Sequence, residues 1–189
     1  MDEQLLIQQL QNEMQSAYVK LVDLYQHLVY NTVLGIIQSN DDAEDVAQEV
    51  FIQVFQSIKH FKGESKLSTW LYRIAITKSL DWQRRKSRKK RFAIIERFFG
   101  IDDSLKHDPP EFHHPGVAIE NKEKATLLFK AMTKLPENQR IAFTLNKVEG
   151  LSYLEVATVM QVTEASVEAL LHRAKQNLRK ELVNYYDKK

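Results

Sequence analysis

The segment EVATVMQVTEASVEALLHRAK, residues Glu155 to Lys175, has the apolar spacing of a helix that stops for three residues and then resumes. The first helix begins with a capping box, in which Ser152 is the cap and Glu155 lies three residues later. The sequence QVT turns the chain, and Thr163 caps a second helix that continues to about Tyr186. Two helices joined by so short a turn predict a helix-turn-helix.

The second helix of this motif has one apolar and one polar face. The apolar face contains Val167, Leu170, Leu171, Ala174, Leu178 and Leu182. The opposite face presents Ala165, Glu168, Ala169, His172 and Gln176, flanked by Arg173, Lys175, Arg179 and Lys180. In DNA-binding helix-turn-helix units the first turns of this helix enter the major groove, and basic neighbours hold phosphates. The pattern therefore favours DNA binding, with a plain helical hairpin as the alternative.

Helical periodicity extends over most of the 189 residues. Further helices are predicted at about 2–14, 16–38, 41–58, 69–86, 120–134 and 137–147. Five glycines and four prolines are too few for a chain of many β-turns. The acidic stretch FGIDDSLKHDPPEFHHPG contains three of the prolines and is typical of a linker. We expect an all-α protein with two helical domains, 1–91 and 120–189, joined by an acidic linker at 92–119.

Composition excludes several classes of protein. The absence of cysteine excludes a disulfide scaffold and thiolate chemistry. The N-terminal sequence MDEQLLIQQLQNEM lacks the pattern of a signal peptide, and no apolar run approaches the ~20 residues of a membrane span, so we expect an intracellular protein. No phosphate-binding loop or nucleophile motif occurs, so neither enzymatic activity nor a cofactor is expected. A metal site at His107, His113 and His114 is a weaker alternative.

The helix predicted at 41–58 combines a broad apolar face with an acidic one. Asp41 is expected to cap it, with Glu44 completing a capping box. The face opposite the core contains Asp42, Asp45, Glu49, Gln53 and Gln56, with Ile52 exposed among them. A solvated helix face explains the acids alone. The exposed Ile52 favours a docking surface for a basic partner.

The helix predicted to begin after residue 68 carries an aromatic and basic stripe of Trp70, Arg73, Thr77, Asp81 and Arg84. Such a surface suits single-stranded nucleic acid, because bases stack on rings while cations follow the phosphates. The alternative is that Trp70 and Tyr72 shield the edge of the core. The run RRKSRKKR, Arg84–Arg91, contains seven bases in eight positions, and these charges repel one another unless a polyanion neutralises them. Nucleic acid is the expected polyanion, with an acidic protein or membrane surface as alternatives.

Three segments together resemble the extracytoplasmic-function (group IV) sigma factors, the specificity subunits of bacterial RNA polymerase. The segment DAEDVAQEVFIQVF resembles region 2.2 of that family, and FKGESKLSTWLYRIAITKSLDWQRR resembles regions 2.3–2.4. The segment LPENQRIAFTLNKVEGLSYLEVATVMQVTEASVEALLHRAKQNLRKEL resembles region 4. All three occur in the family's order, and the resemblance covers nearly the whole chain except the linker.

The resemblance implies a role for each surface. Residues that would dock the β′ clamp of core RNA polymerase are Asp42, Asp45, Gln48, Glu49 and Ile52. Residues that would engage the −10 element are Phe61, Lys62, Gly63, Glu64, Ser65, Lys66, Trp70, Arg73, Thr77, Arg84, Arg85, Lys86 and Arg88. Residues that would read the −35 duplex are Ser152, Tyr153, Thr163, Glu164, Ala165, Ser166, Glu168, Ala169, His172, Arg173 and Lys175.

The resemblance also implies partners and a location. They are core polymerase, including its β flap, promoter DNA and an anti-sigma factor. The linker would thread toward the RNA exit path. The protein would be cytoplasmic, at the nucleoid when active or at the inner membrane when bound by an anti-sigma factor.

Four positions depart from the family pattern. Thr77 stands where Asn is frequent, Glu168 and Ala169 where basic or hydroxyl residues are common, and Gln161 where a small residue is usual. A promoter sequence borrowed from other members is therefore not expected to apply. Two other functions compete with the sigma-factor interpretation. One is a two-domain regulator that binds DNA independently of polymerase, and the other is a helical interaction protein such as an anti-sigma factor or adaptor.

Overall fold

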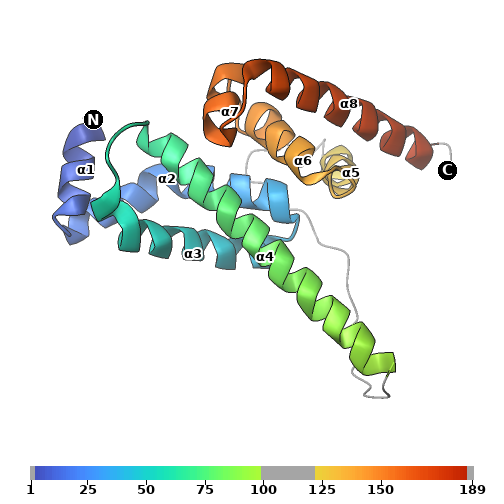
Figure 1. Ribbon diagram of the computed structural model, residues 1–189, viewed down its shortest axis with the longest axis horizontal. Coiled ribbons are helices and arrows are strands. Elements are labelled where there is room, and N and C mark those ends of the chain that lie inside the picture. The colour runs from blue at the N-terminus through green and yellow to red at the C-terminus, as the bar shows by residue number, and fades with distance from the viewer. Residues whose placement is uncertain (1–2, 99–121, 187–189) are drawn as a thin grey trace.

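The computed structural model describes residues 3–98 and 122–186, which form two helical domains (Figure 1). The first contains α1 (Glu3–Gln11), α2 (Gln15–Ile37), α3 (Asn40–Ser57), the 3-10 helix η1 (Ile58–His60) and α4 (Leu67–Phe98). The second contains α5 (Lys122–Met132), α6 (Glu137–Phe143), the π-helical turn η3 (Thr144–Val148), α7 (Tyr153–Met160) and α8 (Glu164–Tyr186). No strand occurs in these ranges, and the predicted all-α fold is confirmed.

The core of the first domain lies between α2, α3 and α4. The apolar face predicted for α3 is buried there, with Val46, Val50 and Val54 at 0% exposure. The prediction that Asp41 caps this helix is wrong, because α3 begins at Asn40 and Ser39 occupies the cap position. Asp41 lies in the first turn instead, where the positive end of the helix dipole favours a carboxylate.

Helix α1 holds the loop between η1 and α4 at both ends. The Glu3 Oε1 atom accepts a hydrogen bond from the backbone N–H of Leu67 at 3.1 Å, which satisfies an orphan donor at the start of α4. The Gln11 Nε2 atom donates to the carbonyl of Phe61 at 2.9 Å. These hydrogen bonds therefore fix the position of the loop between η1 and α4 relative to α1, although the loop contains no regular secondary structure.

The predicted helix-turn-helix is present. Ser152 Oγ accepts from the Glu155 N–H at 3.3 Å, and Glu155 Oε2 accepts from the Ser152 N–H at 3.0 Å, so the capping box of α7 is complete. Thr163 Oγ1 accepts from the Ser166 N–H at 3.2 Å and caps α8. The apolar residues of α8 pack on α6 and α7: Val167, Leu171, Ala174 and Leu178 are buried, and Leu170 and Leu182 are partly buried.

Two helices differ most from their predicted bounds. The helix expected at 137–147 consists of α6 followed by the π-helical turn η3. Helix α4 continues to Phe98 and enters the segment expected to be linker. Its sequence contains no glycine or proline between Leu67 and Phe98, so nothing in its own chemistry ends the helix earlier. The rest of the predicted linker lies outside the described residues.

The two domains lie against each other, with α4 between α3 and α7 (Figure 1). Ile36 of α2 and Tyr72 of α4 belong to the apolar core of the second domain and are 1% and 7% exposed. None of the helices in the described ranges has the length and apolarity that crossing a membrane requires.

Gln161, the first residue of the turn in the helix-turn-helix, has left-handed backbone angles of φ 57° and ψ 44°. Left-handed backbone angles cost a residue with a side chain about 1–2 kcal/mol of conformational free energy, whereas glycine adopts them without this cost. Gln161→Gly should therefore stabilise the second domain by about 0.5–1 kcal/mol after the entropy of glycine in the unfolded chain is subtracted. Urea unfolding measures this, with Gln176→Gly in the exposed interior of α8 as control. The same exchange there should destabilise by about 1 kcal/mol. Equal effects at both sites would contradict the prediction.

Candidate nucleic-acid interface

An acidic and apolar face runs along α3 on the side opposite the core. Each of the five residues predicted to dock a partner is at least partly exposed on it: Asp42, Asp45, Gln48, Glu49 and Ile52. Ile52 is 57% exposed, and Phe55, one turn further, is 55% exposed. The Phe55 ring packs on that of Tyr18 with centroids 4.8 Å apart. Sequence reasoning missed Phe55, although its spacing of three residues from Ile52 placed it beside this face.

The basic run of α4 reaches back to this acidic face. Lys86 Nζ lies 2.9 Å from Asp42 Oδ2, and an Arg85 guanidinium nitrogen lies 3.1 Å from Glu49 Oε2. Arg84 pairs with Asp81 on its own helix at 3.4 Å. The expectation that only a polyanion neutralises the run is therefore wrong for these three bases. The pairs of Arg84 and Arg85 are exposed, and the Lys86–Asp42 pair is half-buried. Exposed ion pairs contribute about 0–1 kcal/mol, so a polyanion or a partner protein can replace them at little cost.

The loop before α4 is mostly exposed, with one exception. Lys62, Gly63, Glu64 and Lys66 are exposed, and Ser65 is half-buried. Gly63 has φ +72°, a conformation that favours glycine. Phe61 departs from its predicted role as a DNA contact, because it is 8% exposed and stacks on the ring of Trp70 with centroids 4.8 Å apart. In this structure Phe61 holds Trp70 in place.

The stripe predicted on α4 contains a contact that sequence reasoning missed. Trp70 and Arg73 are half-buried and Thr77 is exposed. The Arg73 guanidinium donates to the Thr158 carbonyl at 2.7 Å and to the Val159 carbonyl at 3.4 Å, both on α7. The Thr77 hydroxyl donates to the Arg73 carbonyl at 2.8 Å. No signal in the sequence links residue 73 to residues 158 and 159.

The outward face of the helix-turn-helix is open. Its predicted DNA-contacting residues are exposed at Ser152, Tyr153, Thr163, Glu164, Ala165, Ser166, Glu168, His172, Arg173 and Lys175, and half-buried at Ala169. Among the apolar residues near it, Leu154 is 61% exposed and was not predicted. The arrangement places the first turns of α8, two cations and two carboxylates on one accessible surface.

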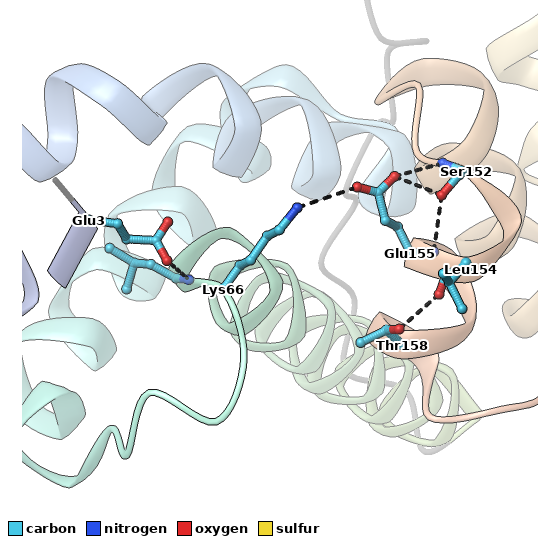
Figure 2. A network of polar contacts seen from close by, with 7 residues as sticks. Glu3, Lys66, Ser152, Leu154, Glu155 and Thr158 are labelled. Atoms are coloured by element: carbon cyan, nitrogen blue, oxygen red, sulfur yellow. Dashed lines mark hydrogen bonds and ion pairs between the residues drawn. The ribbon is translucent and has the colours of Figure 1, made fainter. Parts of the chain in front are cut away.

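A polar network joins the loop of the first domain to α7 (Figure 2). Lys66 Nζ lies 3.9 Å from Glu155 Oε1, which is also a member of the α7 capping box. Hydrogen bonds from the backbone and hydroxyl of Ser152 lower the pKa of Glu155 below its ordinary value. The carboxylate is therefore negatively charged where it faces the Lys66 ammonium.

A second carboxyl, Glu149, is half-buried where the two domains meet. It accepts a hydrogen bond from the Tyr72 hydroxyl of α4 at 3.1 Å, and the Asn31 side chain of α2 also hydrogen-bonds to it. Within the described residues no ion pair involves Glu149. Burial raises the pKa of Glu149 to about 7, and the two hydrogen bonds lower it less than burial raises it. The pKa of Tyr72 is raised by burial and by the charges of Glu149 and Glu155.

We expect this carboxyl to make the contact between the domains depend on pH. A pKa raised from the ordinary 4.5 to about 7 means that packed domains bind the proton more tightly than separated ones. The stabilisation that Glu149 gives to the packed domains is therefore complete below its ordinary pKa, and it is lost as pH rises through about 7. Energy transfer between dyes on the two domains should fall over this window. Glu149→Gln should show no such change, and a wild-type signal that is flat with pH would contradict the prediction.

Metal ligands are not clustered in the part of the chain that the structure describes. No group of three or more His, Asp or Glu residues there is arranged to hold an ion. His107, His113 and His114, the alternative metal site, lie outside the described residues.

Comparison with known proteins identifies both domains. The family model described as Sigma-70 region 2 matches residues 21–89, and the one described as Sigma-70, region 4 matches residues 126–178. The chain is 32% identical over 184 residues to RNA polymerase sigma-H factor of Pseudomonas aeruginosa, covering 95% of this chain and 93% of that protein. It is 31% identical over 178 residues to ECF RNA polymerase sigma-E factor of Escherichia coli K12, covering 92% and 91%.

Solved structures show the same fold. CnrH, in a complex with the cytosolic domain of CnrY, matches with a TM-score of 0.68 at 20% identity, over 96% of this chain and 97% of that one. RpoE of Bartonella quintana, in a complex with the anti-sigma factor NepR, matches with a TM-score of 0.63 at 19% identity, over 87% and 96%. With both regions matched and relatives above 30% identity along nearly the whole length, the chain belongs to the extracytoplasmic-function sigma factors of the sigma-70 family.

Proposed function

We propose how this alternative sigma factor directs promoter-specific transcription: α3 docks core polymerase, the loop before α4 with Trp70 opens the −10 element, and the helix-turn-helix reads the −35 duplex. The observation that carries the proposal is the separation of these three accessible surfaces on different elements of the two domains. The alternative of a regulator that acts without polymerase is not favoured, because the relatives are named as sigma factors.

The acidic face of α3 suits the β′ clamp of the polymerase. Exposed carboxylates steer a basic partner, and Ile52 and Phe55 supply apolar area that loses water on docking. The ion pairs from Lys86 and Arg85 exchange for contacts with the partner at little free energy. We infer that region 4 also contacts the β flap.

Opening of the −10 element would use the loop at 61–66 and the stripe on α4. A base that leaves the duplex stack loses a few kcal/mol, which stacking on an aromatic ring and contacts in a pocket offset. Trp70 is half-exposed, and Lys62 and Lys66 lie free of the core to neutralise phosphates. The exposed bases Arg84 and Arg88 extend this surface along α4. Phe61 contributes by supporting Trp70.

Reading of the −35 element would use the first turns of α8. The start of α8 at Glu164 and Ala165 presents its first backbone N–H groups to a phosphate, and Arg173 and Lys175 add charge. Glu168 can accept a hydrogen bond from the N4 amino group of cytosine, and Ala165 or Ala169 can contact a thymine methyl group. Both kinds of contact occur in the major groove.

The remaining expectations are consistent with this role. We infer that the protein is cytoplasmic, performs no chemistry itself and needs no cofactor, because the polymerase catalyses RNA synthesis. An anti-sigma factor is a proposed partner, since the two solved relatives were each captured in a complex, one of them with an anti-sigma factor.

Run-off transcription on fragmented genomic DNA tests the function. Cognate core polymerase with this protein should produce new transcript starts that share −35 and −10 motifs at fixed spacing, and core alone should not. The sequenced 5′ ends also define the promoter. If folded protein and active core produce no new starts, the proposed function is wrong.

A further inference from the structure

The start of α4 takes its cap from another helix. The Lys66 carbonyl accepts the first hydrogen bond of α4 from the Trp70 N–H at 3.2 Å, so Lys66 occupies the N-cap position. A lysine side chain carries only donors and cannot accept from the N–H groups of the first turn. The Ser65 hydroxyl donates to the Lys66 carbonyl at 3.4 Å. The acceptor for the Leu67 N–H is the carboxylate of Glu3 on α1, 64 residues away in the sequence (Figure 2).

The other end of this loop is held by the same helix. Gln11 is half-buried, and its Nε2 atom donates to the Phe61 carbonyl at 2.9 Å and to the Ile58 carbonyl at 3.4 Å. An ion pair of 2.7 Å joins Lys59 Nζ to Glu13 Oε1 nearby. Both of its side chains are exposed, so this pair adds little. Two hydrogen-bonding side chains of α1 therefore close the loop, one at each end.

The middle of the loop is open to solvent. Lys62, Gly63 and Glu64 are exposed, and an added Cβ atom at Gly63 would meet no atom within 4 Å. A loop with loose ends samples many backbone conformations, and ordering it on DNA would reduce the affinity. The anchor at Phe61 also fixes the ring that stacks on Trp70, with centroids 4.8 Å apart. The hydrogen bonds from α1 therefore set both the course of the loop and the position of the Trp70 ring.

We propose that Glu3 and Gln11 are positioning residues for −10 recognition: from α1 they hold the loop and the Trp70 ring in the geometry that captures an unstacked base. The inference rests on the proposed function of the loop. Both side chains act through the backbone of the loop and need no contact with DNA. Leu6 and Leu10 of α1 are buried in the core of the domain, at 3% and 0% exposure, so the anchors themselves are fixed. Such positioning matters because a site that selects one ligand must be held to within about 0.5 Å.

Selection of active promoters by holoenzyme tests this role, with a library randomised over the −10 element of the promoter that run-off transcription defines. Gln11→Met and Glu3→Ala each remove one anchor. Each should reduce discrimination at the −10 position whose base is captured by about fivefold (about 1 kcal/mol). Affinity for core and preferences at the −35 element should stay at wild-type values. Glu3→Gln keeps an acceptor oxygen and should restore most of the discrimination. The matched control is Gln8→Met, at an exposed position of the same helix, which should behave as wild type.

Two outcomes overturn the inference. One is that Gln11→Met and Glu3→Ala both keep the wild-type −10 preferences. The other is that activity falls equally on every −10 sequence, together with a lower melting temperature, because a loss of folded protein changes the amount of activity and not the choice of base. If wild-type protein with active core produces no new starts, the proposed function itself has failed, and this result is known before any variant is compared.

Discussion

Replacing Asp45 with Lys and Ile52 with Ser together should weaken binding to core polymerase by ~100-fold or more and abolish transcription at limiting protein. Charge reversal and loss of an apolar anchor at the centre of an interface each remove on the order of 2 kcal/mol, and tenfold in affinity is about 1.4 kcal/mol. Both side chains are exposed, so the change should leave the free energy of unfolding within about 0.5 kcal/mol. Fluorescence titration of labelled protein with core measures the affinity.

The control for this variant is Glu181→Lys, a reversal of charge at an exposed site on α8 outside every proposed surface. It should bind core as tightly as wild type. Melting temperatures of all three proteins exclude unfolding as the cause of lost binding. If the double variant binds core with wild-type affinity, α3 is not the docking face and its acids are an ordinary solvated surface.

Glu168→Gln should change which base is preferred at one position of the −35 element. A carboxylate accepts from the cytosine N4 amino group, whereas a glutamine amide pairs with N6 and N7 of adenine. Each such pairing discriminates against the wrong base by about 1–3 kcal/mol, so the preference at that position should shift by ~10-fold or more. Selection of active promoters from a library randomised over the −35 element, with holoenzyme containing either protein, measures the shift.

The matched control for this selection is Glu181→Lys, which should return the wild-type −35 motif. Preferences at the −10 element should be the same for all variants, because Glu168 lies on the other domain. A wild-type −35 profile from Glu168→Gln would show that this carboxylate does not read a base. A uniform loss of activity over all sequences would assign it to positioning instead.

Local chemistry explains why much of the fold was predictable. Ser152 with Glu155 and Thr163 with Ser166 satisfy backbone donors within a single turn, so the starts of α7 and α8 follow from short-range sequence. The apolar face of α3 follows from its spacing in the same way. Ser39 and Asp41 are both residues that favour the N-cap position, and they lie two positions apart. The prediction placed the cap of α3 at Asp41 instead of Ser39, because their preferences for this position differ little.

The site was predicted less completely than the fold. Exposure follows from helical periodicity, so the surfaces of α3 and α8 were correctly expected to face solvent. Phe61 was expected at the DNA surface, but it is buried under Trp70, since an aromatic ring beside a core gains more from burial than from water. Periodicity carried no information about Phe61, because it lies in a loop.

The sequence by itself determined the helices, their caps, the helix-turn-helix and the family, because these depend on interactions between residues a few positions apart. Only the tertiary structure showed that Arg73 contacts the end of α7, that the Tyr72 hydroxyl donates to Glu149, and that Gly35 leaves room for Thr144. These pairs join residues far apart in the chain, and neither partner shows a periodic or capping pattern that specifies the other. Contacts of this kind exist only once both domains have folded and packed.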